Sequence, residues 1–177
     1  MIAGRTAAYI PADRLAEIRE RLSARDQLIT DLLRATGYRL DDIMYARIWQ
    51  LRAQPVALIE RKTGKLRTVQ LPEALHLQLV AAFASRSAMA YAWRALRAGG
   101  RRKQHRTTYW RHFVAAVAAC GYEDCGYTPH SLRKVYAVEA FRRTHSLRAV
   151  QSDLGHAYIG TTAIYALSSL DTGDSCR

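Results

Sequence analysis

Apolar residues recur at helix-like intervals along most of this chain, and this pattern constrains the fold more than any other feature. Between Pro11 and Ala35 the pattern predicts two helices joined near Ser23 to Asp26, with Gly37 ending the second helix. Further helices are predicted over residues 39–47, after Pro72, over 109–119, from the segment at 128–133 to about 143, over 147–154, and over 161–167.

One region departs from the helical period. Residues 48–51 and 56–60 are rich in apolar, β-compatible residues, and we predict two short strands there. Residues 66–71 alternate between two faces, and the turn Lys62-Thr63-Gly64-Lys65 precedes them, so a β-hairpin with Lys62 near its tip is expected. The expected fold class is therefore mainly α with a small antiparallel β-sheet (α+β).

The charge balance favours a polyanionic partner. The 177 residues include 27 Lys and Arg against 15 Asp and Glu, a net charge of +12, which attracts nucleic acid. Genome composition alone could also produce an excess of arginine. An RNA-binding protein would explain the charge equally well, but that class predicts aromatic residues stacked on a sheet.

The sequence contains neither a membrane-spanning pattern nor a metal-binding pattern. No apolar run is long enough for a signal peptide or a membrane span, so a cytoplasmic protein is expected, associated with the nucleoid when it is bound to DNA. Cys120, Cys125 and Cys176 do not match a two-pair zinc pattern. Neither a cofactor nor a metal is expected.

A basic segment at residues 94–106 is the clearest candidate for DNA contacts. Trp93, Tyr109 and Trp110 flank it, and its cationic side chains could bind backbone phosphates. The alternative is a mobile, solvated loop. The candidate DNA-binding residues are Arg94, Arg97, Arg101, Arg102, Lys103 and Arg106.

Three short motifs near the C-terminal end carry possible chemistry. In His130-Ser-Leu-Arg133 the imidazole and guanidinium are three positions apart at a predicted helix start, so both can reach one phosphate. Leu154-Gly155-His156 supplies a second imidazole, and Tyr165 follows nine residues later. Each motif alone is common by chance.

Taken in this order, the motifs resemble those of the tyrosine recombinase family, the phage-integrase type of site-specific recombinase. The segment Thr36-Gly37-Tyr38-Arg39-Leu40-Asp41-Asp42 is similar to the TGxRxxE string that carries the first arginine of that family. The family also places a catalytic lysine in a hairpin turn, which corresponds here to Lys62, with Lys65 as the alternative. The resemblance spans residues 25–168 and implies a recombinase catalytic-domain fold.

The resemblance also implies a proton path for cutting DNA. Tyr165 would be the nucleophile that attacks the backbone phosphate. Because a free tyrosine has a pKa of about 10, it needs help to lose its proton, and His130 is the expected base. Lys62 would protonate the departing 5′ oxygen as general acid.

The remaining family positions would stabilise negative charge on the phosphate. Arg39 and Arg133 suit this task because a guanidinium binds two phosphate oxygens at once, and His156 would add a third donor. Asp42 is expected to orient the Arg39 segment, although an ordinary surface acid is the alternative.

We therefore expect site-specific recombination of double-stranded DNA through a covalent 3′-phosphotyrosine, by integration, excision or inversion. The expected partners are DNA, further copies that form a tetramer on DNA, and accessory DNA-bending proteins. The alternatives are a catalytically idle DNA-binding regulator, a truncated integrase remnant, and an enzyme similar to type IB topoisomerases.

The chain is expected to form a single catalytic domain over residues 1–177. It comprises a helical lead-in at 1–24, the catalytic core at 25–168 and a short tail at 169–177, without a separate N-terminal core-binding domain.

Overall fold

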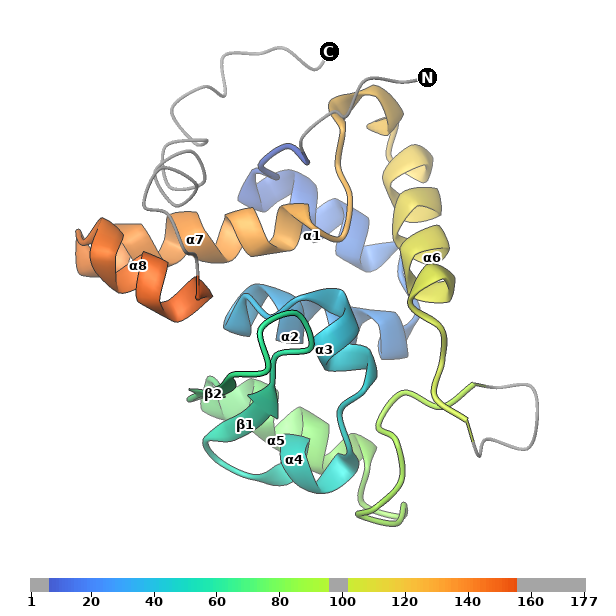
Figure 1. Cartoon of the computed structure of the whole chain (residues 1–177). Coiled ribbons are helices and arrows are strands. Elements are labelled where there is room, and N and C mark those ends of the chain that lie inside the picture. Colours follow the sequence, from blue (N-terminus) through green and yellow to red (C-terminus); the bar gives the residue numbers. More distant parts are fainter. Residues whose placement is uncertain (1–6, 96–101, 156–177) are drawn as a thin grey trace.

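The computed structural model describes residues 7–95 and 102–155, and most of them lie in helices (Figure 1). The elements are α1 (Ala12–Glu20), α2 (Ala24–Thr36), α3 (Leu40–Met44), α4 (Ile48–Arg52), β1 (Val56–Ile59), β2 (Leu66–Val69), α5 (Glu73–Ala82), α6 (Arg106–Ala119), the 3-10 turn η1 (Glu123–Cys125), α7 (Ser131–Thr144) and α8 (Leu147–Leu154). The predicted fold class is confirmed. The predicted helix at 161–167 lies outside the described residues.

Helix α2 is the centre of the fold, because it packs against α1, α3, α5, α6 and α7. Its ends are defined locally, as the sequence predicts. The Ser23 hydroxyl accepts a hydrogen bond from the Asp26 backbone N–H at the start, and Gly37 ends the helix with a φ of 61°. This left-handed end turns the chain sharply into α3.

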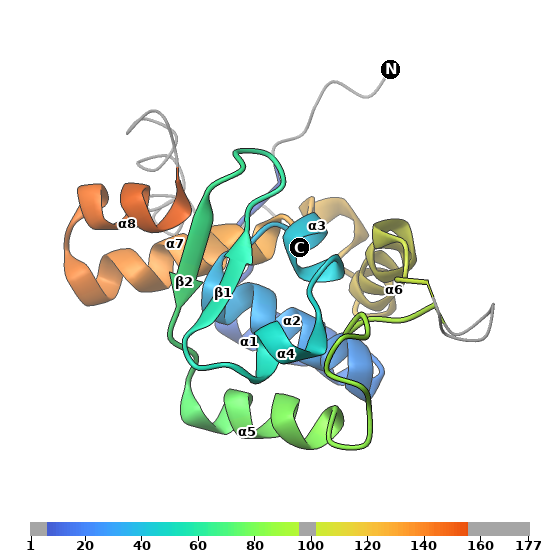
Figure 2. The ribbon, with the colours of Figure 1, turned by 60° about the horizontal axis from the view of Figure 1, so that its bottom comes forward.

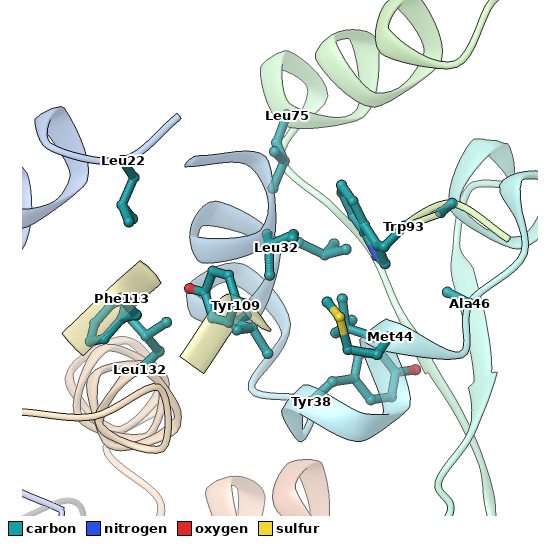
Figure 3. Close-up of a cluster of buried hydrophobic side chains, with 14 of the residues drawn as sticks. Leu22, Leu32, Tyr38, Met44, Ala46, Leu75, Trp93, Tyr109, Phe113 and Leu132 are labelled. Atoms are coloured by element: carbon teal, nitrogen blue, oxygen red, sulfur yellow. The ribbon is translucent and has the colours of Figure 1, made fainter. Parts of the chain in front are cut away.

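The hydrophobic core surrounds α2. In Figure 3, side chains from α2, α5, α6 and α7 meet around Leu32, with Trp93 at one side and Phe113 at the other. Trp93 and Phe83 contact each other edge to face, with ring centroids 5.5 Å apart. The core thus joins segments from both halves of the chain into one body.

The predicted hairpin is present and lies between α3 and the end of α8 (Figure 2). Strands β1 and β2 pair antiparallel, with Val56 opposite Val69 and Ile59 opposite Leu66. The Gly64 N–H donates to the Glu60 carbonyl at 2.7 Å and closes the turn that carries Lys62. This position sets the turn beside the segment that holds Arg39.

The strand predicted at residues 48–51 is wrong, because these residues form helix α4. Ile48 and Leu51 are both fully buried three positions apart, a spacing that suits one face of a helical turn. The Gln50 side chain caps the Arg47 N–H at 2.8 Å, and the Ile48 N–H binds the Ala90 carbonyl. Long-range packing therefore decided the conformation of a short apolar run that was ambiguous by pattern.

Within residues 7–95 and 102–155, no helix combines the length and apolar character that crossing a membrane requires.

Candidate active site

Arg39 stands at the junction of α2 and α3, where Gly37 redirects the chain. Its backbone N–H donates to Asp42 Oδ2 at 3.2 Å, while Asp42 Oδ1 accepts from the backbone N–H of Arg61 at 2.8 Å. Asp42 is buried, and burial raises the pKa of its carboxyl, against the lowering effect of these two hydrogen bonds. Asp42 thereby joins the Arg39 segment to the hairpin turn.

Glu60 is a second buried acid at the same junction, and sequence reasoning missed it. Its Oε2 lies 3.2 Å from Nη1 of Arg39 and accepts a hydrogen bond from the Thr63 hydroxyl at 2.9 Å. The contact with Arg39 is an ion pair without hydrogen-bond geometry, so Arg39 Nη1 has no hydrogen-bond partner among the described residues. The charge of this buried nitrogen is thus paired with Glu60, while its N–H groups lack an acceptor among the described residues.

Arg133 is 2% exposed and lies on the first turn of α7. Its guanidinium donates to two backbone carbonyls, that of Gly37 at the end of α2 and that of Leu154 at the end of α8. Both are carbonyls at helix ends, which carry partial negative charge and need donors. Arg133 therefore holds the Arg39 segment and the Leu154-Gly155 segment in a fixed relation to α7.

Three further observations show how closely these segments approach one another. A β-carbon added to Gly37 would lie 2.5 Å from Cδ1 of Tyr136 on α7, and one added to Gly155 would lie 3.4 Å from Glu60 Oε2. Arg67 on β2 donates to the Thr36 carbonyl at the end of α2. The ends of α2 and α8, the start of α7 and the hairpin thus meet at one place.

His130 precedes α7 and is exposed to solvent. The protein packed around its ring lowers its pKa mainly by desolvation, and the charges of Arg133, Arg39 and Lys134 lower it further. The imidazole is therefore neutral at pH 7 and able to accept a proton. The effect of Arg39 and Arg133 on one imidazole means that all three side chains lie within electrostatic reach.

Lys62 and its alternative Lys65 are both exposed on the hairpin turn. The turn is anchored through Arg61, whose backbone binds Asp42 and whose guanidinium carbon lies 3.6 Å from the centroid of the Tyr45 ring. The structure thus brings the lysine turn to the Arg39 junction and leaves the lysine side chains accessible.

The basic segment reaches the same region from the other side. Nζ of Lys103 lies 3.8 Å from the centroid of the Tyr45 ring, and Arg106 pairs with Asp41 at 3.3 Å. Arg94 and Lys103 form a β-bridge, and Arg102 is exposed. Tyr45 therefore connects the basic segment to the lysine turn, a link that sequence reasoning missed.

Four of the predicted residues lie outside the described part of the chain: His156, Tyr165, Arg97 and Arg101. Among the described candidates, the fold brings together Arg39, His130 and Arg133. Lys62 is on the adjacent turn, and Asp42 binds the backbone of Arg39 and of Arg61.

Glu60 could have been found from sequence, because an acid at the end of an otherwise apolar strand is a signal of a buried, paired carboxylate. No comparable signal marks Tyr45. Chemically, the junction offers fixed positive charge, a neutral imidazole and accessible lysines, a set that suits an anionic ester substrate.

Comparison with known proteins gives a consistent result. The model of the phage integrase family matches residues 11–170. The tyrosine recombinase XerA of Pyrococcus furiosus is 30% identical over 155 residues, which cover 86% of this chain and 53% of that protein. The tyrosine recombinase XerC of Mycobacterium tuberculosis is 32% identical over 167 residues, covering 89% and 54%. The chain thus spans about half the length of these curated relatives.

Solved structures show the same fold. A crystal structure of XerA recombinase has a TM-score of 0.72 at 23% identity, covering 92% of this chain and 61% of that chain. The structure of lambda integrase residues 75–356 bound to DNA has a TM-score of 0.74 at 19% identity, covering 99% and 65%.

Proposed function

Because this chain belongs to the phage integrase family, we propose that it is a tyrosine site-specific recombinase that breaks and rejoins double-stranded DNA through Tyr165. The observation that carries the proposal is the junction where Arg39, His130 and Arg133 lie within electrostatic reach of one another, beside the turn that bears Lys62. Each cation near the imidazole disfavours protonation of His130, so a neutral proton acceptor lies beside fixed positive charge.

In the proposed first step, the phenol oxygen of Tyr165 attacks a backbone phosphorus. The bond from phosphorus to the 5′ oxygen breaks, which leaves a 3′-phosphotyrosine and a free 5′-hydroxyl. Arg39 would stabilise the charge that develops on the nonbridging oxygens, using the buried donor that has no hydrogen-bond partner among the described residues. Arg133 would add its positive charge and hold the surrounding segments, with His156 as a further donor.

Proton transfer accompanies both bond changes. The Tyr165 hydroxyl would give its proton to His130, whose pKa is lowered so that the neutral imidazole predominates at pH 7. Lys62, or Lys65 in its place, would give a proton to the departing 5′ oxygen. Asp42 would act by positioning Arg39 and the hairpin turn together.

Attack of a 5′-hydroxyl from another strand on the phosphotyrosine would reverse these steps and join new partners without an external energy source. Strand exchange of this kind needs several active sites on paired DNA. A lambda integrase tetramer bound to a Holliday junction is among the structures with this fold. By analogy we propose a tetramer on DNA here, in the cytoplasm, with DNA-bending proteins as accessory partners.

Two other functions would use the same surface. A catalytically idle DNA-binding regulator, or a remnant of a longer integrase, would bind DNA without forming an adduct. An enzyme similar to type IB topoisomerases would form the adduct but would relax supercoiled DNA and exchange no strands. Adduct formation and strand exchange therefore separate the three possibilities.

The decisive experiment uses a suicide DNA substrate, nicked next to candidate recombination sites taken from the flanks of the gene. We expect a protein–DNA adduct on a denaturing gel with the wild-type chain and none with Tyr165→Phe. The adduct should also resist chelators, since no metal takes part in the proposed steps. Duplex binding without an adduct at any candidate site would contradict the proposed chemistry and support the idle regulator.

A further inference from the structure

A pocket of about 690 Å³ lies between the start of α2 and the start of α6, outside the junction described above. Among the described residues that line it, Arg25, Arg102, Lys103 and Arg111 carry a positive charge, and Asp26 is the single carboxylate. Asp26 is itself engaged, because its Oδ2 lies 2.8 Å from Nδ1 of His112. The pocket therefore has a strong excess of positive charge.

Gln104 is a buried, incompletely bonded residue in the wall of this pocket. The residue is 5% exposed, and its Nε2 has no hydrogen-bond partner among the described residues. Burying an amide donor without a partner destabilises a protein, so native proteins rarely leave such a donor without a hydrogen bond. A ligand that accepts a hydrogen bond would remove this cost.

The pocket wall is held in place by backbone contacts. The Gln104 N–H donates to the Trp93 carbonyl at 2.7 Å, and the Ala95 N–H donates to the Arg102 carbonyl at 2.8 Å. Trp93 is fully packed in the core. The amide of Gln104 is therefore presented from a fixed backbone rather than from a free loop.

Two helix starts add to the positive potential. Ser23 precedes α2, His105 precedes α6, and both residues line the pocket. The starts of helices carry partial positive charge and favour anions. Burial lowers the pKa of Arg25, and the charge of Arg94 lowers it further, against the opposing effect of Asp26.

We propose that this pocket binds a phosphate group of the DNA backbone other than the one that Tyr165 attacks. The proposal rests on the DNA-binding function proposed above. Gln104 would donate to a phosphate oxygen, while Arg102 and Lys103 would supply charge. The volume suits a phosphate with its flanking sugars, since pockets for small ligands span about 300–1,000 Å³.

The position of Lys103 favours a DNA phosphate over a free one. Lys103 lines the pocket and also lies against Tyr45, whose other cationic neighbour is Arg61 on the hairpin. A continuous basic path thus runs from the pocket to the lysine turn. A duplex whose cleaved phosphate lies at the junction could follow this path and place a second phosphate in the pocket.

The test measures duplex affinity at several salt concentrations, with Tyr165→Phe as background so that no cleavage occurs. We expect Gln104→Met to weaken binding about tenfold, because a hydrogen bond to a charged group is worth about 1.4 kcal/mol or more. Arg102→Gln should weaken binding and reduce the salt slope by about one phosphate contact. Arg142→Gln is the matched control, because this substitution also removes one positive charge. Arg142 is exposed at the end of α7 and does not line the pocket.

A loss of DNA affinity in these variants can be distinguished from a loss of stability. Gln104→Met keeps the size of the side chain and removes a donor without a described partner, so the unfolding temperature should stay the same or rise. If Gln104→Met and Arg102→Gln both bind duplex as tightly as the background protein, the proposal is overturned while the proposed recombinase function stands. A background protein that binds no duplex at any salt would instead overturn the proposed function itself.

A second arm distinguishes the source of the phosphate. Inorganic phosphate is titrated into the free protein while the NMR signal of the Gln104 side-chain amide is followed. A saturable shift together with unchanged duplex affinity in Gln104→Met would mean that the pocket serves free phosphate, which overturns the DNA-backbone proposal. A loss of duplex affinity in Gln104→Met supports it.

Discussion

Arg133 donates a hydrogen bond from its guanidinium to the backbone carbonyl of Gly37, which lies 96 residues earlier in the chain. The same guanidinium binds the Leu154 carbonyl at the end of α8. One buried side chain therefore holds together the ends of two helices and the start of a third. This contact links the two arginines of the proposed site, because Gly37 is two residues from Arg39.

Arg133→Lys tests this arrangement. The ammonium group of lysine cannot donate to both carbonyls in the geometry of the two guanidinium nitrogens, so at least one helix-end carbonyl loses its donor. We expect the free energy of unfolding to fall by about 3 kcal/mol, measured by chemical denaturation, together with loss of adduct formation. Arg142→Lys on the same helix is the control and should change neither. An unchanged midpoint in Arg133→Lys would show that these bonds do not stabilise the fold.

Gly37→Ala combines two separate costs. The residue has a φ of 61°, which disfavours any side chain by about 1–2 kcal/mol, and the new methyl group would lie 2.5 Å from Tyr136. Gly121→Ala is the matched control, because Gly121 has a φ of 76° but nothing within 4 Å of an added β-carbon. We expect Gly37→Ala to lower the free energy of unfolding by about 2 kcal/mol more than Gly121→Ala. Equal effects would mean that Tyr136 moves aside freely.

The lowered pKa of His130 predicts how stability depends on pH. In the unfolded chain this imidazole titrates near its ordinary pKa of about 6.5, whereas desolvation by the protein around the ring and the neighbouring cations lower the pKa in the folded protein. As pH falls below about 6.5, the unfolded state binds the proton more readily, so stability is lost. Denaturation at pH 7 and pH 5 should therefore show a smaller loss in His130→Gln than in the wild type.

The same shift predicts the pH dependence of DNA cleavage. If neutral His130 accepts the Tyr165 proton, the rate of adduct formation should rise with pH along a limb whose midpoint lies below 6.5 and should be level at pH 7. Lys134→Gln removes one cation that lowers this pKa, so its limb should move to higher pH. A limb that stays in place in Lys134→Gln, or that persists in His130→Gln, would assign the titration to another group.

The ring of Tyr45, which is not one of the proposed catalytic residues, is expected to stabilise the hairpin. Arg61 and Lys103 both lie against its ring, at 3.6 Å and 3.8 Å from the centroid. Tyr45→Leu should lower the free energy of unfolding by about 1 kcal/mol and increase hydrogen exchange in the hairpin, whereas Tyr45→Phe should retain both contacts. Equal behaviour of the two variants would show that the attraction between the ring and the two cations does not contribute to stability.

Local signals in the sequence determined most of the helices and the hairpin. Ser23 and Gly37 define α2, Gly155 ends α8, and the Lys62 to Lys65 turn joins two antiparallel strands. These features are predictable because caps and turns depend on a few neighbouring residues. The order of the motifs from Arg39 to Tyr165 likewise indicates the family from the amino acids alone, and the family match confirms it.

Tertiary structure alone decided the relations between distant residues. Residues 48–51 became helical because Ile48 and Leu51 are buried together and the Ile48 N–H donates to the distant Ala90 carbonyl, which a short apolar run does not encode locally. Two examples are the pairing of Glu60 with Arg39 and the amide of Gln104, which has no hydrogen-bond partner in the part of the chain that the structure describes; both depend on which segments α2 brings together. Burial and electrostatic environment are properties of the packed molecule, so the sequence named the reactive residue types and the fold determined their partners, charge states and positions.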